Sequence, residues 1–166
     1  MESREKPDAT VDVVKPPVEW VVVEPEKDDV EAMVNRGIEE TRKKSGKDSE
    51  QPKAYHNEEH VMRVVEAVEK IGREEELTDK EIAMLKIAAG WHDVETGMGP
   101  GVSEDESARL CQKEMTDRGF GELETQIVGD LIRATKNVII DGVIKQEIGD
   151  LEETSGMYGL GLMKRV

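Results

Sequence analysis

The spacing of apolar residues along the chain predicts helices for most of its length. After Pro52, apolar side chains recur every three or four residues, at Val61, Val64, Val65, Val68 and Ile71. This spacing places side chains on one face of an α-helix. Asn57 precedes the first of them, and an asparagine there can accept a hydrogen bond from a free backbone N–H group. We therefore expect an amphipathic helix that begins beside Asn57.

A second helix is predicted to be buried at the centre of the fold. Residues 78 to 81, TDKE, have the pattern of a capping box, in which side chain and backbone at a helix start bond each other reciprocally. The segment behind it, IAMLKIAAGWHD, is apolar on nearly all sides, and Lys86 is its only charge before His92. A helix that is apolar all round is usually buried. Helical spacing places His92 on the same inward face as Leu85 and Ala89.

Two more helices flank this pair. Residues 28 to 44 have a weak apolar stripe with helical spacing. Residues 103 to 106, SEDE, have a second capping-box pattern, which predicts that a helix opens at Ser103 and ends at Gly119.

The C-terminal part combines a fifth helix with a hairpin signal. Leu123, Ile127 and Leu131 recur every four residues and predict the helix. In residues 138 to 144, VIIDGVI, an Asp-Gly pair stands between β-branched residues, which is typical of a hairpin turn but too short to form a sheet by itself. We therefore expect an all-α bundle with a short hairpin-like C-terminal segment.

The N-terminal region differs from the rest of the chain. Residues 1 to 28 hold four of the six prolines among many charges, which predicts an extended or partly disordered arm. Within it, residues 18 to 23, VEWVVV, have strand composition, and both an ordered edge segment and disorder remain open for them. We expect one domain over residues 29 to 166, with its motif core at residues 54 to 136.

The charge of the chain limits its partners. Asp and Glu number 38 against 23 Lys and Arg, which gives a formal net charge of -15. Such a protein repels a nucleic-acid polymer and an anionic membrane surface, so we expect neither as a partner. It would also repel a small phosphorylated molecule, unless a local cation reverses the field inside the binding site.

Cysteine usage and hydropathy indicate the compartment. The single cysteine, Cys111, forbids an internal disulfide, and its spacing from Ala108 and Met115 predicts a small buried side chain. The sequence has no apolar run long enough for a signal peptide or a membrane span. These features predict a cytoplasmic protein.

Candidate chemistry is concentrated at the three histidines of the chain. They lie in AYHNEEH, residues 54 to 60, and in GWHD, where Asp93 follows His92 directly. An unpaired carboxylate at the end of an apolar helix would cost several kcal/mol or become protonated. A divalent metal ion held by imidazoles and this carboxylate would satisfy the charge. Each histidine alone also fits an ordinary core or surface role, but together the two segments favour a metal site.

These motifs resemble a known family. AYHNEEH followed by GWHD, SEDESARL and LIRAT resembles the HD-domain metal-dependent phosphohydrolases, in particular small predicted phosphohydrolases with a YHN-x-x-H opening. The likeness covers residues 55 to 135, about half the chain. It implies a compact HD-domain-like helical bundle in which His60, His92 and Asp93 ligate a divalent metal ion (Mn, Fe, Ni, Zn or Mg), and in which His56 acts as general acid. Glu104 stands where a glutamate usually follows the HD pair, and a water-positioning role and a helix-dipole role are both open for it.

The sequence departs from the family pattern near its end. The family closes with one more aspartate, and the best counterpart here, TSGMYGLG, places Thr154 and Gly156 at the two aspartate positions. Asp141 and Asp150 lie upstream as acidic alternatives. A missing ligand predicts looser metal binding and weak or absent hydrolysis, with Thr154→Asp raising the metal affinity.

Three functions follow from these observations. The resemblance implies a metal-dependent phosphohydrolase acting on a small phosphate ester or nucleotide. The missing aspartate favours a catalytically weak or inactive HD module that binds a ligand or partner. A helical interaction domain without metal is the third alternative. The sequence does not rank the basic residues near the motifs as phosphate contacts; these are Arg63, Arg109, Arg133 and Lys136.

Overall fold

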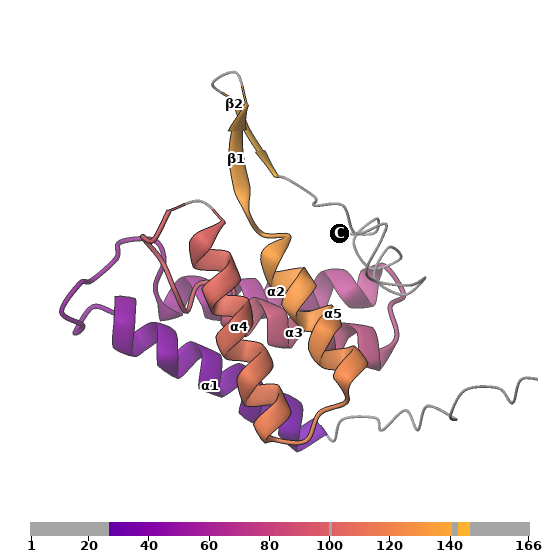
Figure 1. Cartoon of the computed structure of the whole chain (residues 1–166). Coiled ribbons are helices and arrows are strands. Elements are labelled where there is room, and N and C mark those ends of the chain that lie inside the picture. Colours follow the sequence, from indigo (N-terminus) through magenta and orange to yellow (C-terminus); the bar gives the residue numbers. More distant parts are fainter. Residues whose placement is uncertain (1–26, 100, 141–142, 147–166) are drawn as a thin grey trace, which may run out of the picture.

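Five helices and one β-hairpin make up the part of the chain that the computed structural model describes, residues 27–99, 101–140 and 143–146. The helices are α1 (Lys27–Ser45), α2 (Glu58–Glu74), α3 (Asp79–Trp91), α4 (Val102–Asp117) and α5 (Glu122–Arg133). Strands β1 (Asn137–Ile140) and β2 (Val143–Gln146) pair antiparallel and project from the bundle beyond the end of α5 (Figure 1). The all-α class is confirmed, and the hairpin signal corresponds to β1 and β2.

Several expectations concern residues outside the described ranges. They include the arm up to residue 26, the strand-like segment 18 to 23, and the aspartate candidates Asp141 and Asp150. The C-terminal string that begins at Thr154 also lies outside. Helix α1 begins at Lys27, within the last two residues assigned to the arm.

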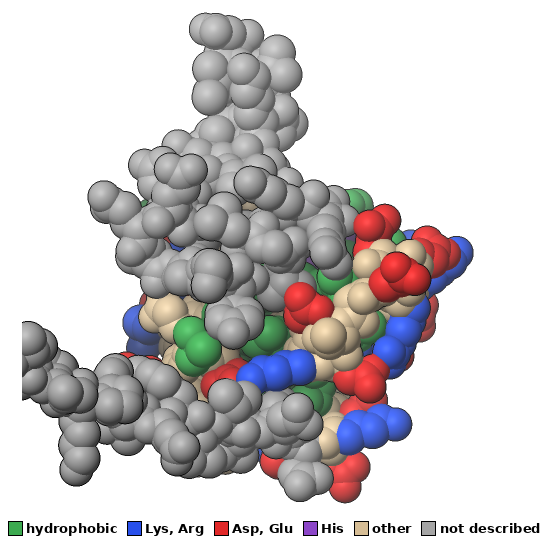
Figure 2. Space-filling view, turned by 90° about the vertical axis from the view of Figure 1, so that its right-hand side faces the viewer, with side chains coloured by type: hydrophobic (Ala, Val, Ile, Leu, Met, Phe, Trp, Pro, Cys, Tyr) green, Lys and Arg blue, Asp and Glu red, His purple; other side chains and the backbone are tan. Residues whose placement is uncertain are grey.

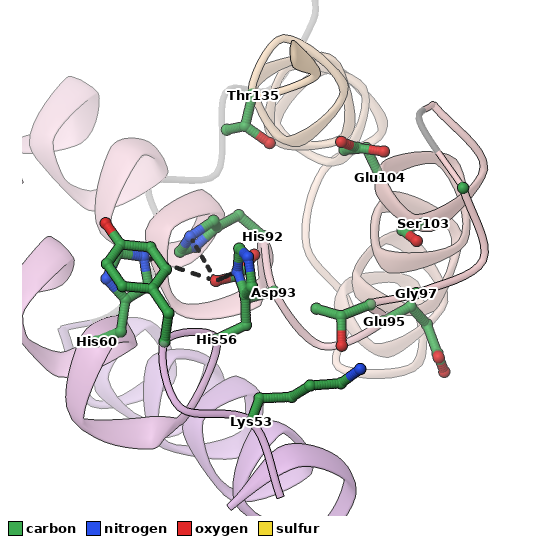
Figure 3. A pocket seen from close by; sticks show the side chains of 13 residues that line it. Lys53, His56, His60, His92, Asp93, Glu95, Gly97, Ser103, Glu104 and Thr135 are labelled. Atoms are coloured by element: carbon green, nitrogen blue, oxygen red, sulfur yellow. Dashed lines mark hydrogen bonds and ion pairs between the residues drawn. The ribbon is translucent and has the colours of Figure 1, made fainter. Parts of the chain in front are cut away.

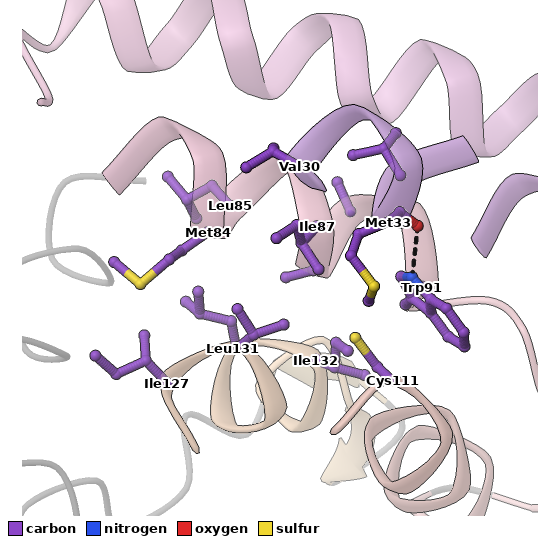
Figure 4. Packing of buried hydrophobic residues seen from close by; sticks show 14 of the residues in the cluster. Val30, Met33, Met84, Leu85, Ile87, Trp91, Cys111, Ile127, Leu131 and Ile132 are labelled. Carbon is purple, nitrogen blue, oxygen red and sulfur yellow. Dashed lines mark hydrogen bonds between the residues drawn. The ribbon is translucent and has the colours of Figure 1, made fainter. Parts of the chain in front are cut away.

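Helix α3 is the centre of the bundle, as its composition predicts. It packs against α1, α2, α4 and α5. Its apolar residues meet Val30 and Met33 of α1 on one side and Leu131 and Ile132 of α5 on another (Figure 4). The Trp91 indole N–H donates to the Met33 carbonyl at 2.9 Å, which satisfies a polar group that would otherwise be buried without a partner.

The one charged side chain of α3 beyond its first turn is also compensated. The Lys86 ammonium lies 2.8 Å from a Glu69 oxygen on α2 and 3.7 Å from a Glu31 oxygen on α1. These two contacts join the outer helices to α3 through a mostly buried side chain.

Two of the predicted helix starts are confirmed in detail. The Asn57 side chain accepts a hydrogen bond from the backbone N–H of His60 at 3.1 Å. At α3, the Thr78 hydroxyl accepts from the Glu81 N–H, and a Glu81 carboxylate oxygen accepts from the Thr78 N–H at 2.8 Å. Local sequence therefore determines where α2 and α3 begin.

The predicted capping box at residues 103 to 106 is wrong. Helix α4 begins at Val102, and its cap is Gly101 with φ 82°. Glu104, not Glu106, accepts the backbone N–H of the cap residue, at 2.9 Å. The Ser103 hydroxyl accepts the Met98 N–H instead, at 3.1 Å. A left-handed glycine reverses the chain earlier than the SEDE pattern predicts.

The apolar pattern predicted for α4 and α5 is only partly confirmed. Ile127 and Leu131 of the predicted stripe are buried together with Val128 and Ile132, but Leu123 in the first turn of α5 is 48 % exposed. Cys111 is fully buried, and burial raises the pKa of its thiol, so the prediction of a small buried side chain is confirmed.

Charged side chains cover much of the remaining surface. On the face shown in Figure 2, acidic and basic side chains lie interspersed over the described residues. Many form pairs within one helix, such as Arg36 with Glu40 and Arg118 with Glu114. Exposed pairs of this kind contribute little to stability, about 0–1 kcal/mol each.

Helices α1 and α3 approach each other closely at two glycines. A Cβ atom at Gly37 would lie 2.7 Å from the carbonyl carbon of Gly90, and one at Gly90 would lie 3.2 Å from the Val34 Cα atom. Both neighbours are backbone atoms, which cannot rotate away. The crossing therefore requires the absence of side chains at these positions.

Gly37→Ala is expected to lower the free energy of unfolding by about 1–3 kcal/mol, because the added methyl group forces the two helices apart. Urea unfolding monitored by circular dichroism measures the change. Gly129→Ala is the matched control, since it is also a helical glycine but its neighbour is the movable end of the Gln112 side chain. Alanine also favours the helix by about 1 kcal/mol over glycine. A Gly37→Ala variant as stable as wild type would contradict the close approach.

Candidate metal centre

The start of α2 holds two of the histidines. Asn57 fixes both, because its amide N–H groups donate to the carbonyl oxygens of Lys53 at 3.2 Å and Ala54 at 3.3 Å, while its oxygen accepts from the His60 N–H. His56 lies in the bonded turn before the cap, and His60 lies in the first turn after it. Asn57 therefore sets the position of His56 and His60 relative to each other.

The end of α3 holds the third histidine and the aspartate. His92 is the C-cap residue of α3, and its Nδ1 lies 2.8 Å from the Ala89 carbonyl oxygen. The next residues are anchored: Val94 is fully buried, and the Glu95 N–H donates to the Ser107 hydroxyl at 2.9 Å. Asp93 is thereby held between two fixed points, and the carbonyl end of a helix favours a nearby cation.

All three histidines of the chain converge on one oxygen atom. The Asp93 Oδ2 lies 2.9 Å from His56 Nδ1, 3.6 Å from His60 Nε2 and 3.2 Å from His92 Nε2 (Figure 3). His56 and Asp93 are 37 positions apart in sequence. The packing of α2 against α3 is therefore what assembles the group.

The hydrogen bond between His92 and Ala89 determines which ring nitrogen of His92 carries the proton. It therefore also determines whether Nε2 can donate to Asp93. A carbonyl oxygen only accepts, so Nδ1 carries the proton toward Ala89. In a neutral ring Nε2 is then an acceptor, and it faces a carboxylate oxygen, which is also an acceptor. Two acceptors 3.2 Å apart need a proton or a metal ion between them. The same arrangement, with the second ring nitrogen bonded to a carbonyl, is typical of metal-binding histidines.

The electrostatics of the group agree with this geometry. Burial acts to raise the pKa of Asp93, but the hydrogen bonds and charges of His92 and then His56 outweigh it and lower that pKa to about 2. Burial acts to lower the pKa of His92, but the hydrogen bond and charge of Asp93 prevail and raise it. Burial lowers the pKa of His60, against the attraction of Asp93. The carboxylate is therefore ionised at neutral pH, and His60 is the most readily neutral ligand.

The donor set fits a divalent metal ion. One ligand atom each from His60, His92 and Asp93 lie within 4.8 Å of one another, so this group can hold an ion. Donors at about 2.0–2.2 Å from one ion are at most about 4.4 Å apart, and the contacts of 3.6 and 3.2 Å from the carboxylate oxygen satisfy this limit. Mixed imidazole and carboxylate ligation suits Zn, Mn, Fe or Ni better than Ca. The ligand roles themselves stay a prediction.

Exposure separates the three histidines into two kinds. The side chains of His60 and His92 are only 18 % and 12 % exposed, whereas that of His56 is 50 % exposed. His60 and His92 are thus mostly covered and expose little ring surface to the pocket. His56 can contact both Asp93 and a bound ligand.

A pocket of about 600 Å³ opens beside the group. Its described lining includes the three histidines, Asp93, Lys53, Glu95, Ser103, Glu104 and Thr135 (Figure 3). Glu104 lies on α4, across the pocket from the histidines, where it caps that helix through the Gly101 N–H. The helix-capping contact of Glu104 is therefore observed, and its water-positioning role stays a prediction.

Sequence reasoning missed several residues of this pocket. The exposed Tyr55 ring contacts His60 in a tilted arrangement, with ring centroids 4.4 Å apart. Lys53 also lines the pocket, and its place four positions before Asn57 is the only sequence signal for it. Thr135, just beyond α5, is the last residue of the LIRAT string, but the sequence indicated no role for its side chain. Arg109, one of the basic residues near the motifs, pairs with Glu106.

Comparisons of the chain with protein-family models, with curated proteins and with solved structures gave no match. Among the residues that the structure describes, no helix has the length and apolar character needed to cross a bilayer. The fold and the candidate metal centre therefore carry the functional argument.

Proposed function

We propose that this protein is a metal-dependent phosphohydrolase of the HD type that acts on a small phosphate ester or nucleotide. The observation that carries the proposal is the convergence of His60, His92 and Asp93 beside an open pocket. The resemblance of the YHN-x-x-H and HD motifs to that family supports it independently of the geometry.

His60, His92 and Asp93 would hold the metal. Asp93 brings the negative charge, and His92 presents Nε2 because Nδ1 is engaged by Ala89. When bound, a divalent metal ion offsets the charge of a phosphate and lowers the pKa of a water molecule from 15.7 to about 7. Such positive charge is needed in a chain with a net charge of -15.

His56 would protonate the oxygen of the leaving group. Its Nδ1 is bonded to Asp93 at 2.9 Å, and this contact orients the ring for proton transfer. Half of its side chain remains exposed, so the ring can reach a bound substrate. The Asp93 carboxylate thus contacts both the proposed ligand histidines and the proposed acid.

A catalytically weak HD module that binds a ligand or partner is the second candidate. The observation in its favour is that the metal group among the described residues contains a single carboxylate, Asp93, while the sequence places Thr154 where the family has an aspartate. Such a protein would hold an ion without efficient turnover.

One set of measurements separates these functions. The purified protein, supplied in turn with Mn²⁺, Zn²⁺, Ni²⁺, Fe²⁺ or Mg²⁺, is expected to hydrolyse p-nitrophenyl phosphate or a nucleoside monophosphate, and to lose this activity with a chelator. Metal content is measured on the same samples. Stoichiometric metal without hydrolysis would support the binding module. Absence of metal binding would exclude both HD functions.

A further inference from the structure

We propose that Lys53 binds the phosphate group of the substrate, and that the substrate is a phosphate monoester. The inference rests on the proposed hydrolase function and specifies its substrate class. Among the described residues that line the pocket, Lys53 is the only lysine or arginine. It lies on the side of the pocket opposite Thr135 and extends toward Glu95 (Figure 3).

The Lys53 ammonium group has no acidic partner within the described part of the chain. There its ammonium group has no hydrogen bond and no carboxylate oxygen within ion-pair distance. The acidic groups of the pocket already have other partners: Asp93 contacts the histidines, Glu95 pairs with Lys44, and Glu104 accepts from Gly101. An anion that enters the pocket therefore meets a cation that has no acidic partner among the described residues.

Two of the four basic residues near the motifs, Arg109 and Arg133, are paired with carboxylates outside the pocket. Arg109 forms two hydrogen bonds with Glu106, and Arg133 bonds to Asp105 at 3.2 Å and to Asp130 at 3.4 Å. None of these contacts involves a carboxylate that lines the pocket. Lys53 thus differs from Arg109 and Arg133 both in its place and in its lack of an acidic partner among the described residues.

The backbone of Lys53 is fixed on both sides. Its N–H donates to the Ser45 carbonyl at 2.9 Å, and its carbonyl accepts from Asn57 at 3.2 Å. Asn57 is the same residue that positions His56 and His60, so the lysine stem starts at a set place relative to them. Its ammonium lies beside Gly97, where an added Cβ would be 3.6 Å from Nζ.

Charge matching points to a monoester. The terminal phosphate of a monoester has a second pKa of about 6 and is mostly a dianion at neutral pH, whereas a diester carries a single negative charge. A divalent metal ion at Asp93 and the Lys53 ammonium together provide two separate sources of positive charge. A lysine binds phosphate as a point charge and does not require the fork geometry of arginine.

Binding of inorganic phosphate tests the inference without relying on turnover. Isothermal titration calorimetry on the full chain with Mn²⁺ is expected to show that Lys53→Gln weakens phosphate binding about 10- to 100-fold, the usual effect of losing one charged hydrogen bond. Lys53→Arg should stay within a few-fold of wild type. Lys70→Gln is the control, since it changes the net charge equally on a side chain that is 78 % exposed and outside the pocket.

Steady-state kinetics add a second readout. Lys53→Gln is expected to raise KM for p-nitrophenyl phosphate by a similar factor, with unchanged metal content, and wild type should prefer this monoester to bis-p-nitrophenyl phosphate. Equal phosphate binding by wild type and Lys53→Gln would overturn the role of Lys53. So would an equal loss in Lys70→Gln, or absence of phosphate binding by wild type. Preference for the diester would overturn the substrate class.

These outcomes are distinct from failure of the proposed function. Lys53-dependent phosphate binding without hydrolysis by any metal form would exclude the hydrolase and keep the phosphate site. Hydrolysis of the monoester with a KM that does not depend on Lys53 would keep the hydrolase and exclude the phosphate role of Lys53.

Discussion

Asp93→Asn is expected to lower the affinity of the protein for its divalent metal by at least about 100-fold. Loss of a group that only supports a ligand typically costs 10- to 100-fold, and a direct ligand should cost no less. Asp93 is also the carboxylate on which all three histidines converge, so the amide removes the only negative charge among the three candidate ligands. His92→Ala is expected to have a comparable effect.

Metal content after gel filtration and calorimetric titration with Zn²⁺ or Mn²⁺ measure this loss. Asp117→Asn is the matched control, because it makes the same chemical change on an exposed residue at the last position of α4, whereas the pocket residues Ser103 and Glu104 lie in the first turn. Circular dichroism establishes that each variant is folded. Equal metal content in Asp93→Asn and Asp117→Asn would show that the ligand assignment is wrong.

His56→Ala is expected to reduce kcat about 10²- to 10⁴-fold while the metal content stays at the wild-type level. A positioned general acid contributes a factor of this size. His56 is half-exposed and is not one of the three residues whose ligand atoms lie together within 4.8 Å, so its removal should spare the ion. This combination distinguishes it from His60 and His92, whose loss should remove metal and activity together.

The identity of the leaving group provides an independent test of the acid role. An acidic leaving group such as p-nitrophenolate departs with little protonation, whereas an alkoxide needs a proton. The loss of kcat in His56→Ala should therefore be larger for an alkyl phosphate than for p-nitrophenyl phosphate. A uniform loss across both substrates would indicate that His56 only positions other groups through its hydrogen bond with Asp93.

The sequence by itself determined the local features of this protein. Asn57 and the Thr78 box predicted the starts of α2 and α3, because a cap is decided by side chains within three residues of the helix end. The apolar composition of α3 predicted its central position, because it leaves no face suited to water. The histidine and aspartate motifs indicated which residues to examine for metal binding.

Only the tertiary structure decided how these parts meet. Whether His56 and His60 reach Asp93 depends on the packing of α2 against α3, and the meeting of separate helices is not encoded in the spacing within either one. Helix α4 begins one residue before the predicted Ser103, because Gly101 has a left-handed conformation. Leu123, predicted on the inward stripe of α5, is exposed. Lys53 became a candidate phosphate contact only when its loop, fixed by Ser45 and Asn57, placed it in the pocket. Caps and apolar faces are set by neighbours in sequence, whereas distances across the pocket depend on loop conformation and helix packing.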